Sequence, residues 1–233
     1  MQKKITFYEE PTFIFAIVLL AFAVALTAQA NFGVSMIVAP AYILSLKIDA
    51  ISFGTAEYIL QGLLFILFCI LIKKVKLLYF FSFITAVFYG LVLDLLRFLI
   101  PFLNPNVISP ESIDFVVRIL YLASGIILTS LSIALLFKVY LYPQVYDFFV
   151  KKVSDKFGKK ISSFKIVFDF SFLALSILMT LILFGEIRGI GIGTLVMTLI
   201  NGFTIGIFTK LLDRWVVFKP IWVKFSNLFN ELN

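Results

Sequence analysis

The sequence predicts an all-α polytopic membrane protein, in which six transmembrane helices form two inverted three-helix repeats, each with a short proline-containing broken segment or half-helix. Three observations predict this fold class. The chain is 62% hydrophobic and only 14% charged, whereas soluble domains are close to half apolar and a quarter charged. Apolar stretches of about 20 residues, long enough to cross about 30 Å of hydrocarbon, recur along the chain. Lysines and arginines gather between alternate stretches.

The apolar stretches define the elements in order. They predict spans at about 12–31, 53–72, 77–100, 114–137, 163–184 and 190–212. No segment is left for a soluble domain, so we expect residues 1–233 to form a single transmembrane domain. The first stretch imitates a secretory signal peptide, with Lys3 and Lys4 before it and an Ala-Gln-Ala sequence ending at Ala30. Its apolar part begins at Pro11 and is longer than a signal core, so we expect it to be retained as the first span.

Positive charge predicts the orientation of the spans. Sixteen of the twenty lysines and arginines fall on one side, and only Lys47, Arg97, Arg118 and Arg188 fall on the other. The positive-inside rule therefore predicts both termini in the cytoplasm. The net charge of +7 is then a topology signal, and we expect no nucleic-acid partner because no binding module accompanies it.

Under this topology, the first three spans start inside and the last three start outside. In each half, an apolar, aromatic segment interrupted by proline follows the first span. VSMIVAPAYILSL contains Pro40, and YLYPQVYDFFVKK contains Pro143. The pattern predicts a first repeat at about 12–100 and a second at about 114–212, an arrangement typical of inverted-repeat transporters.

The segment VSMIVAPAYILSL is too short to cross a membrane and too apolar to lie in water. We therefore expect Asn31-Phe32-Gly33 to form a break, followed by a half-helix that packs against protein in the outer half of the membrane. An ordinary amphipathic helix on the membrane surface is the alternative.

Four stretches carry a family resemblance: ANFGVSMIVAPAYILSL, ISFGTAEYILQ, KKISSFKIVFD and FGEIRGIGIGTLVMTLINGF. Together they resemble the YczE/YyaS/YitT family of bacterial integral membrane proteins. The most specific parts are KIVFD, residues 165–169, and GIGIGT, residues 189–194. The resemblance implies a multi-pass protein of the bacterial cytoplasmic membrane and little about activity, since that family is largely uncharacterised. Similar proteins have LGxSP after the first span, where this chain has FGVSM.

Carboxylates inside the predicted spans are the first site candidates, because charge in hydrocarbon is costly. Glu57 and Gln61 are four residues apart and hence share one helix face. Asp169 follows Lys165 by four residues, so it either pairs with this lysine or faces the bundle while the lysine reaches the surface. Both carboxylates are candidates for substrate binding or proton coupling. We favour Glu57, because Gln61 offers it a hydrogen bond and no lysine is near in sequence.

Asp94 is the third carboxylate, in the outer part of the third span. Arg97 follows it by three residues, a spacing at which an ion pair forms easily. We expect a structural ion pair near the interface.

Three further polar residues are ligand candidates: Tyr89 and Asn201, near the middle of the third and sixth spans, and Asn31 at the break. Tyr89 and Asn201 are each followed by glycine, and they either contact a ligand or hold helices together. Close packing through Gly202 and Gly206 would support the second interpretation.

Histidine is absent, and Cys69 lies alone within a span, so we expect no metal site, no cofactor and no enzymatic activity. No strand precedes GIGIGT, which we therefore interpret as a compact turn and not as a phosphate loop. Thr194 is expected to satisfy backbone groups at the start of the sixth span.

These features favour a small secondary transporter or exporter of an unidentified small molecule, with its site between the repeats. A substrate-binding membrane subunit of a multi-component transporter and a non-transporting accessory membrane protein are the alternatives. The expected partners are the lipid bilayer, the small-molecule substrate, and either other copies of the chain or transporter subunits.

Overall fold

The structure is a computed structural model that describes residues 4–73 and 75–230. Lys3 and Lys74, two of the lysines behind the predicted charge bias, lie outside the described residues. Within these ranges, six helices are long and apolar enough to cross a membrane. They are α1 (Glu9–Ala30), α3 (Phe53–Ile72), α4 (Phe80–Leu99, preceded by a 3₁₀ turn at Leu77–Tyr79), α5 (Phe115–Leu136), α7 (Ile161–Phe184) and α8 (Ile192–Trp215). The predicted all-α polytopic membrane protein is confirmed, and the span ends differ from the predicted ones by a few residues.

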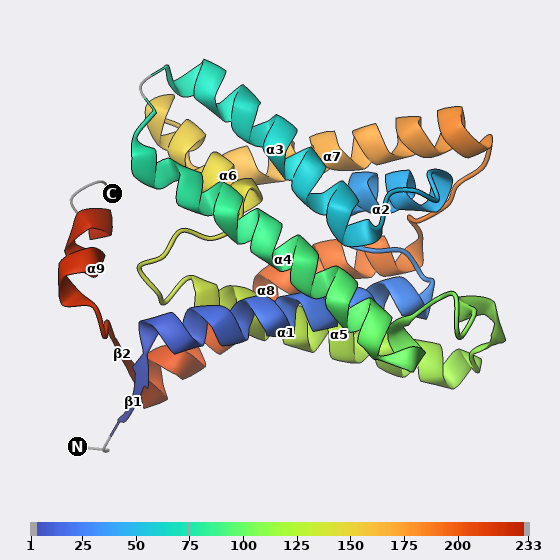
Figure 1. Cartoon of the computed structure of the whole chain (residues 1–233), viewed down its shortest axis with the longest axis horizontal. Helices are drawn as coiled ribbons and strands as arrows, with labels where there is room; N and C mark the ends of the chain where they lie inside the picture. Colours follow the sequence, from blue (N-terminus) through green and yellow to red (C-terminus); the bar gives the residue numbers. More distant parts are fainter. Residues whose placement is uncertain (1–3, 74, 231–233) are drawn as a thin grey trace.

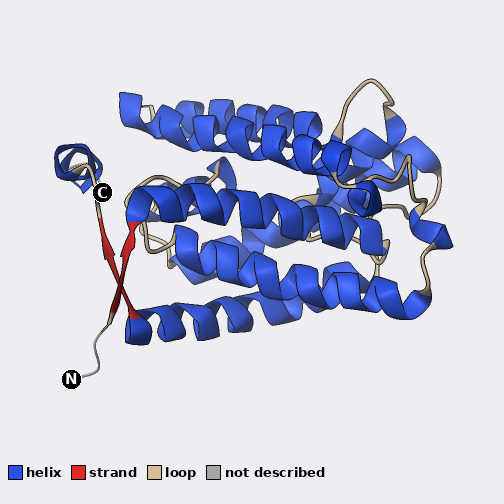
Figure 2. Cartoon of the chain, turned by 60° about the horizontal axis from the view of Figure 1, so that its bottom comes forward, coloured by secondary structure: helices blue, strands red, loops and turns tan. Residues whose placement is uncertain are grey.

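Shorter elements complete the described chain. The helices α2 (Ala39–Lys47) and α6 (Val145–Lys156) follow the first span of each half, and α9 (Val223–Asn230) follows the last span. Two strands, β1 (Ile5–Tyr8) and β2 (Val216–Lys219), pair in parallel and join the two ends of the chain (Figure 2). The sequence patterns predicted neither the strands nor α9.

The helices pack in the arrangement expected of inverted halves. The first helix of each half, α1 and α5, lie side by side (Figure 1). The helix α1 packs against α4 as α5 packs against α8, and α2 contacts α7 as α6 contacts α3. Each half therefore places its short helix against a long helix of the other half.

Two ends of the molecule are used below to locate sites. The terminal side carries both chain ends, the strands, α6 and α9, whereas the opposite side carries α2 and the connections after α4 and α7 (Figure 1). An apolar core surrounds α1 along the bundle, and a second, mainly aromatic core lies on the terminal side between α3, α6, α7 and α9.

The break after α1 has the backbone conformation that the sequence predicts. Asn31 has φ 54° and Gly33 has φ 95°, both in the left-handed region, and α2 then begins with Pro40 in its first turn. The segment is mostly buried, so it packs against protein as predicted, although its helical part is restricted to Ala39–Lys47. Pro143 lies before the start of α6 and not within it, so the two prolines do not occupy equivalent positions.

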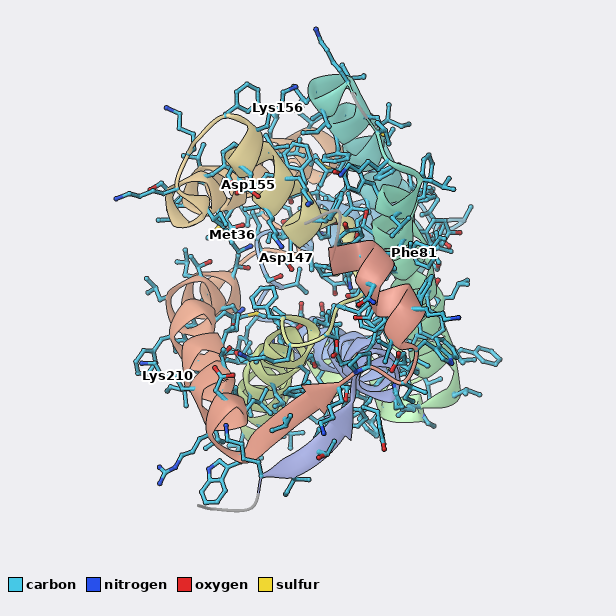
Figure 3. The ribbon with its side chains drawn as sticks, turned by 90° about the vertical axis from the view of Figure 1, so that its left-hand side faces the viewer. Met36, Phe81, Asp147, Asp155, Lys156 and Lys210 are labelled. Atoms are coloured by element: carbon cyan, nitrogen blue, oxygen red, sulfur yellow. The ribbon has the colours of Figure 1, made fainter. Side chains whose placement is uncertain are left out.

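One contact distinguishes the halves. The helix α3 packs along α4, whereas α7 and α8 make no extended contact. Seen from the terminal side, α8 with Lys210 stands apart from α6 with Asp155 (Figure 3). The buried residues of α8 are confined to its beginning: Gly193, Thr194 and Met197.

Glycines explain the close contact in the first half. A Cβ at Gly54 would collide with the backbone carbonyl of Gly90 and the carboxyl group of Asp94, so the crossing of α3 and α4 requires glycine. By contrast, a Cβ at Gly202 or Gly206 would meet nothing within 4 Å. The described residues therefore show no close packing through Gly202 and Gly206, so these glycines do not support a role of Asn201 in holding helices together within this chain.

Candidate functional site

Glu57 occupies the second turn of α3. This helix begins after Ser52, whose hydroxyl accepts a hydrogen bond from the backbone N–H of Thr55 and so caps the first turn. One turn beyond Glu57 lies Gln61, and both side chains are fully buried. The Nε2 of Gln61 donates to Oε2 of Glu57 at 3.2 Å, so the predicted face is shared.

The start of α6 meets this face of α3. Gln61 donates through Nε2 to Oε1 of Gln144 at 3.0 Å, and its Oε1 accepts from the backbone N–H of Val145 at 3.1 Å. The hydroxyl of Tyr146 donates to Oε2 of Glu57 at 3.2 Å. We call Glu57, Gln61, Gln144 and Tyr146 the polar cluster. It joins α3 of the first half to α6 of the second.

The polar cluster is not fully satisfied. Among the described residues, Oε1 of Glu57 and Nε2 of Gln144 have no hydrogen-bond partner, although both atoms are buried. The ion pairs found in this part of the chain do not include Glu57. A buried carboxyl group without a cation is accommodated by binding a proton or by accepting a hydrogen bond from a ligand. The polar cluster can therefore hold either one.

The other three ligand candidates lie on other helices or at the break after α1. Tyr89 on α4 is 1% exposed. Asn201 on α8 has a buried Oδ1 without a partner among the described residues. Asn31 is exposed on the opposite side, where its carbonyl accepts a hydrogen bond from Arg118 at 2.9 Å.

Asp169 is held by a lysine. The Nζ of Lys165 lies 3.4 Å from Oδ1 of Asp169 and 3.4 Å from Oδ1 of Asp147 on α6. Of the two interpretations of this spacing, the structure shows the ion pair. The side chain of Asp169 is half-buried and paired with a cation. Glu57, by contrast, is fully buried and forms no ion pair with the described residues.

The expected ion pair between Asp94 and Arg97 is not formed. Asp94 instead accepts hydrogen bonds from the hydroxyl of Ser52 at 2.5 Å and from the backbone N–H of Gly54 at 2.7 Å. The reason is that the first N–H groups of α3 lack partners within their own helix, and the close crossing of α3 and α4 brings the carboxylate to them. Arg97 lies over the ring of Phe53, 5.4 Å from its centroid.

A cavity of about 530 Å³ opens near the polar cluster on the terminal side. Its walls come from the connection between α5 and α6, from α6, from the start of α7 and from Ser226 of α9. Tyr142 lines it, two residues before Gln144, and the hydroxyl of Tyr142 has no partner among the described residues. Burial raises the pKa of Tyr142 to about 12, so the group remains a neutral hydrogen-bond donor.

The turn GIGIGT meets the break after α1 on the opposite side. The backbone N–H of Val34 donates to the carbonyl of Gly189 at 3.2 Å, and Gly193 donates to the carbonyl of Phe32 at 2.7 Å. The hydroxyl of Thr194 accepts from the N–H of Gly191, which confirms its predicted role at the start of α8. The motif is a tertiary junction in this fold.

No group of three or more Cys, Asp or Glu residues that could hold a metal ion occurs in the described part of the chain. Searches of curated proteins and of solved structures found no match. A family model matches residues 7–210, and nothing links that family by name to the YczE/YyaS/YitT proteins, so this resemblance stays a prediction. The chain belongs to a family of unknown function, DUF6198.

Proposed function

We propose that this protein is a non-enzymatic secondary transporter of a small molecule, located in the bacterial cytoplasmic membrane with both termini in the cytoplasm. The observation that carries the proposal is the carboxyl group of Glu57, fully buried where the two halves meet, with one oxygen that has no partner among the described residues. Transporters built from inverted repeats place substrate and coupling-ion sites at this kind of interface. The resemblance to the YczE/YyaS/YitT membrane proteins and the bias of lysine and arginine support the location and orientation.

In the proposed mechanism, Glu57 carries the coupling proton. Gln61 and Tyr146 orient the carboxyl group through its Oε2, which leaves Oε1 available to a proton or a substrate. The proton reaches Glu57 from the terminal side, because the cavity there extends to Tyr142 and Pro143, next to Gln144 of the polar cluster. A small movement of the first turn of α6 connects the cavity with the carboxyl group.

The experiment uses purified protein in liposomes containing a pH-sensitive dye, with candidate solutes added outside. We expect solute-dependent proton flux in the wild type and in Asp169→Asn, and none in Glu57→Gln, which preserves shape but cannot titrate. Asp169→Asn is the matched control because Asp169 is already paired with Lys165. Thermal unfolding verifies that each variant is folded. Proton flux that is unchanged in Glu57→Gln would exclude the proton-carrier mechanism.

A second candidate function, a substrate-binding subunit of a larger transporter, is favoured by the uncovered face of α8. Leu199 and Phe203 are 80% and 72% exposed, and Gly202 between them has open space around it. Such a face suits either lipid or a partner helix. Solute binding without any transport by the purified chain would favour this function.

The proposed orientation has its own test. In a Cys69→Ala background, Lys151→Cys and Asn106→Cys lie at exposed positions on the terminal and opposite sides. We expect a membrane-impermeant thiol reagent added to intact cells to label the cysteine at 106 and not the one at 151. Labelling of both from outside would contradict the proposed topology.

A further inference from the structure

Arg97 stands out among the arginines of the opposite side. Arg118 donates to the backbone carbonyls of Ala30 and Asn31, and Arg188 pairs with Glu186. Arg97 is half-buried, its Nε is buried without a partner, and it forms no ion pair with any described residue. A guanidinium group partly withdrawn from water, with an N–H that lacks a partner, gains from a hydrogen bond to an anion.

Two carboxylates that line the same cavities as Arg97 are bound by other groups. Asp94, one helical turn before Arg97, uses both oxygens to bind Ser52 and Gly54 at the start of α3. Glu186 is held by Arg188. The aromatic ring of Phe53 supports the guanidinium of Arg97 from one face, which leaves its edge available.

Arg97 also lines two cavities on the opposite side, of about 660 and 740 Å³. The first lies between the break after α1 and the turn after α7, and the second lies between α2, the start of α3 and the connection after α4. Both are large enough for a small organic molecule. Their walls include the apolar side chains of Leu46, Phe53, Phe98, Pro105, Ile187 and Ile190.

We propose that Arg97 binds the carboxylate of an organic monoanion, whose apolar part lies against these walls. The planar fork of a guanidinium binds a carboxylate through two parallel hydrogen bonds. A multiply charged phosphate fits less well, because Glu111 and Asp49 also line the cavities. The inference rests on the proposed function in one respect: it gives the class of the transported solute. Binding at Arg97 does not itself require transport.

The test measures binding to the full chain in lipid nanodiscs at pH 7 by isothermal titration calorimetry. The probes are acetate, benzoate and octanoate, with inorganic phosphate for comparison. We expect benzoate or octanoate to bind more tightly than acetate and phosphate. Arg97→Gln should weaken binding by about 30-fold or more, and Arg97→Lys should weaken it less, since lysine keeps the charge and loses the fork.

Lys47→Gln is the matched control, because Lys47 is an exposed cation on the same side that lines neither cavity, and this variant should bind the probe as the wild type does. Thermal unfolding of all variants separates misfolding from loss of the site. The inference is overturned if none of the carboxylates binds, if Arg97→Gln binds like the wild type, or if Lys47→Gln loses as much affinity. Binding that depends on Arg97, together with proton flux unaffected by Glu57→Gln, would refute the proton-carrier mechanism alone.

Discussion

The two halves of the chain share the order of their helices but differ in the packing of the last two. In the first half, α3 and α4 cross closely through Gly54 and Gly90, and Asp94 links them by hydrogen bonds. In the second half, α7 and α8 make no extended contact, and no hydrogen bond between them is found among the described residues. Apolar helices in lipid gain little from one another's apolar surface, so small residues and polar links decide which pairs close.

The difference indicates that the last two helices pack closely in the first half and stand apart in the second. The cavity on the terminal side lies where α6 and the start of α7 face the end of α5. Four predictions test this comparison, beginning with the largest expected effect.

The closed crossing should not tolerate a larger residue at Gly54. We expect Gly54→Val to reduce the free energy of unfolding by about 3 kcal/mol or more, because the new side chain meets the backbone of Gly90. Gly202→Val, at a glycine with open surroundings, should change stability by less than about 0.5 kcal/mol. Thermal unfolding in detergent measures both. Equal losses would show that α8 packs more closely than the structure indicates.

Substitutions at two glycines with positive φ distinguish the cost of steric crowding from the cost of backbone strain. Gly33 has φ 95° and touches the turn before α8, whereas Gly185, at the end of α7, has φ 73° and open surroundings. We expect Gly185→Ala to cost about 1 kcal/mol from strain alone and Gly33→Ala to cost about 3 kcal/mol. A chemical denaturation series on both variants gives the difference. If the two costs were the same, the junction between the break and GIGIGT would contribute nothing to stability.

The carboxylates that cap helices in the two halves should contribute differently to the free energy of unfolding. Asp94 binds the start of α3 from another helix, whereas Asp114 caps its own helix by accepting from the N–H of Val116. We expect Asp94→Ala to cost about 2 kcal/mol, since it also breaks the link between α3 and α4, and Asp114→Ala about 1 kcal/mol. Their melting temperatures provide the comparison, and a larger effect at Asp114 would contradict it.

The smallest effect is expected in the C-terminal segment that contains α9. The carboxylate of Glu10 accepts hydrogen bonds from the backbone N–H groups of Ile221 and Trp222 and from the hydroxyl of Tyr140, and so fixes the start of α9. Glu10→Ala should increase amide hydrogen exchange in residues 221–230 by about tenfold, with little change in global stability. Exchange rates equal to those of the wild type would show that aromatic packing alone holds α9.

Much of the fold follows from sequence patterns, because a membrane span needs a minimum apolar length and its ends are marked by charge. The break at Gly33 was also predictable, since a short apolar segment beside glycine neither spans a bilayer nor dissolves in water. The strands could not be predicted: four residues each carry too little pattern, and their pairing joins positions more than 200 residues apart.

The candidate site was only half predictable. The spacing of Glu57 and Gln61 places them on one face, but no pattern indicates that Gln144 and Tyr146 of α6 meet that face. For Asp94, local spacing pointed to Arg97, whereas the unpaired N–H groups at the start of α3 were the stronger partner in the fold.

The attachments of α8 have a mechanical consequence. Its beginning is fastened to the break after α1 through Phe32 and Val34, and its end continues into β2, which pairs with the strand preceding α1. Because both ends of α8 are attached, tilting this helix would break the hydrogen bonds at one end or the other. Any closure of the space between α7 and α8 therefore requires α7 to travel while α8 stays with α1 as the fixed frame.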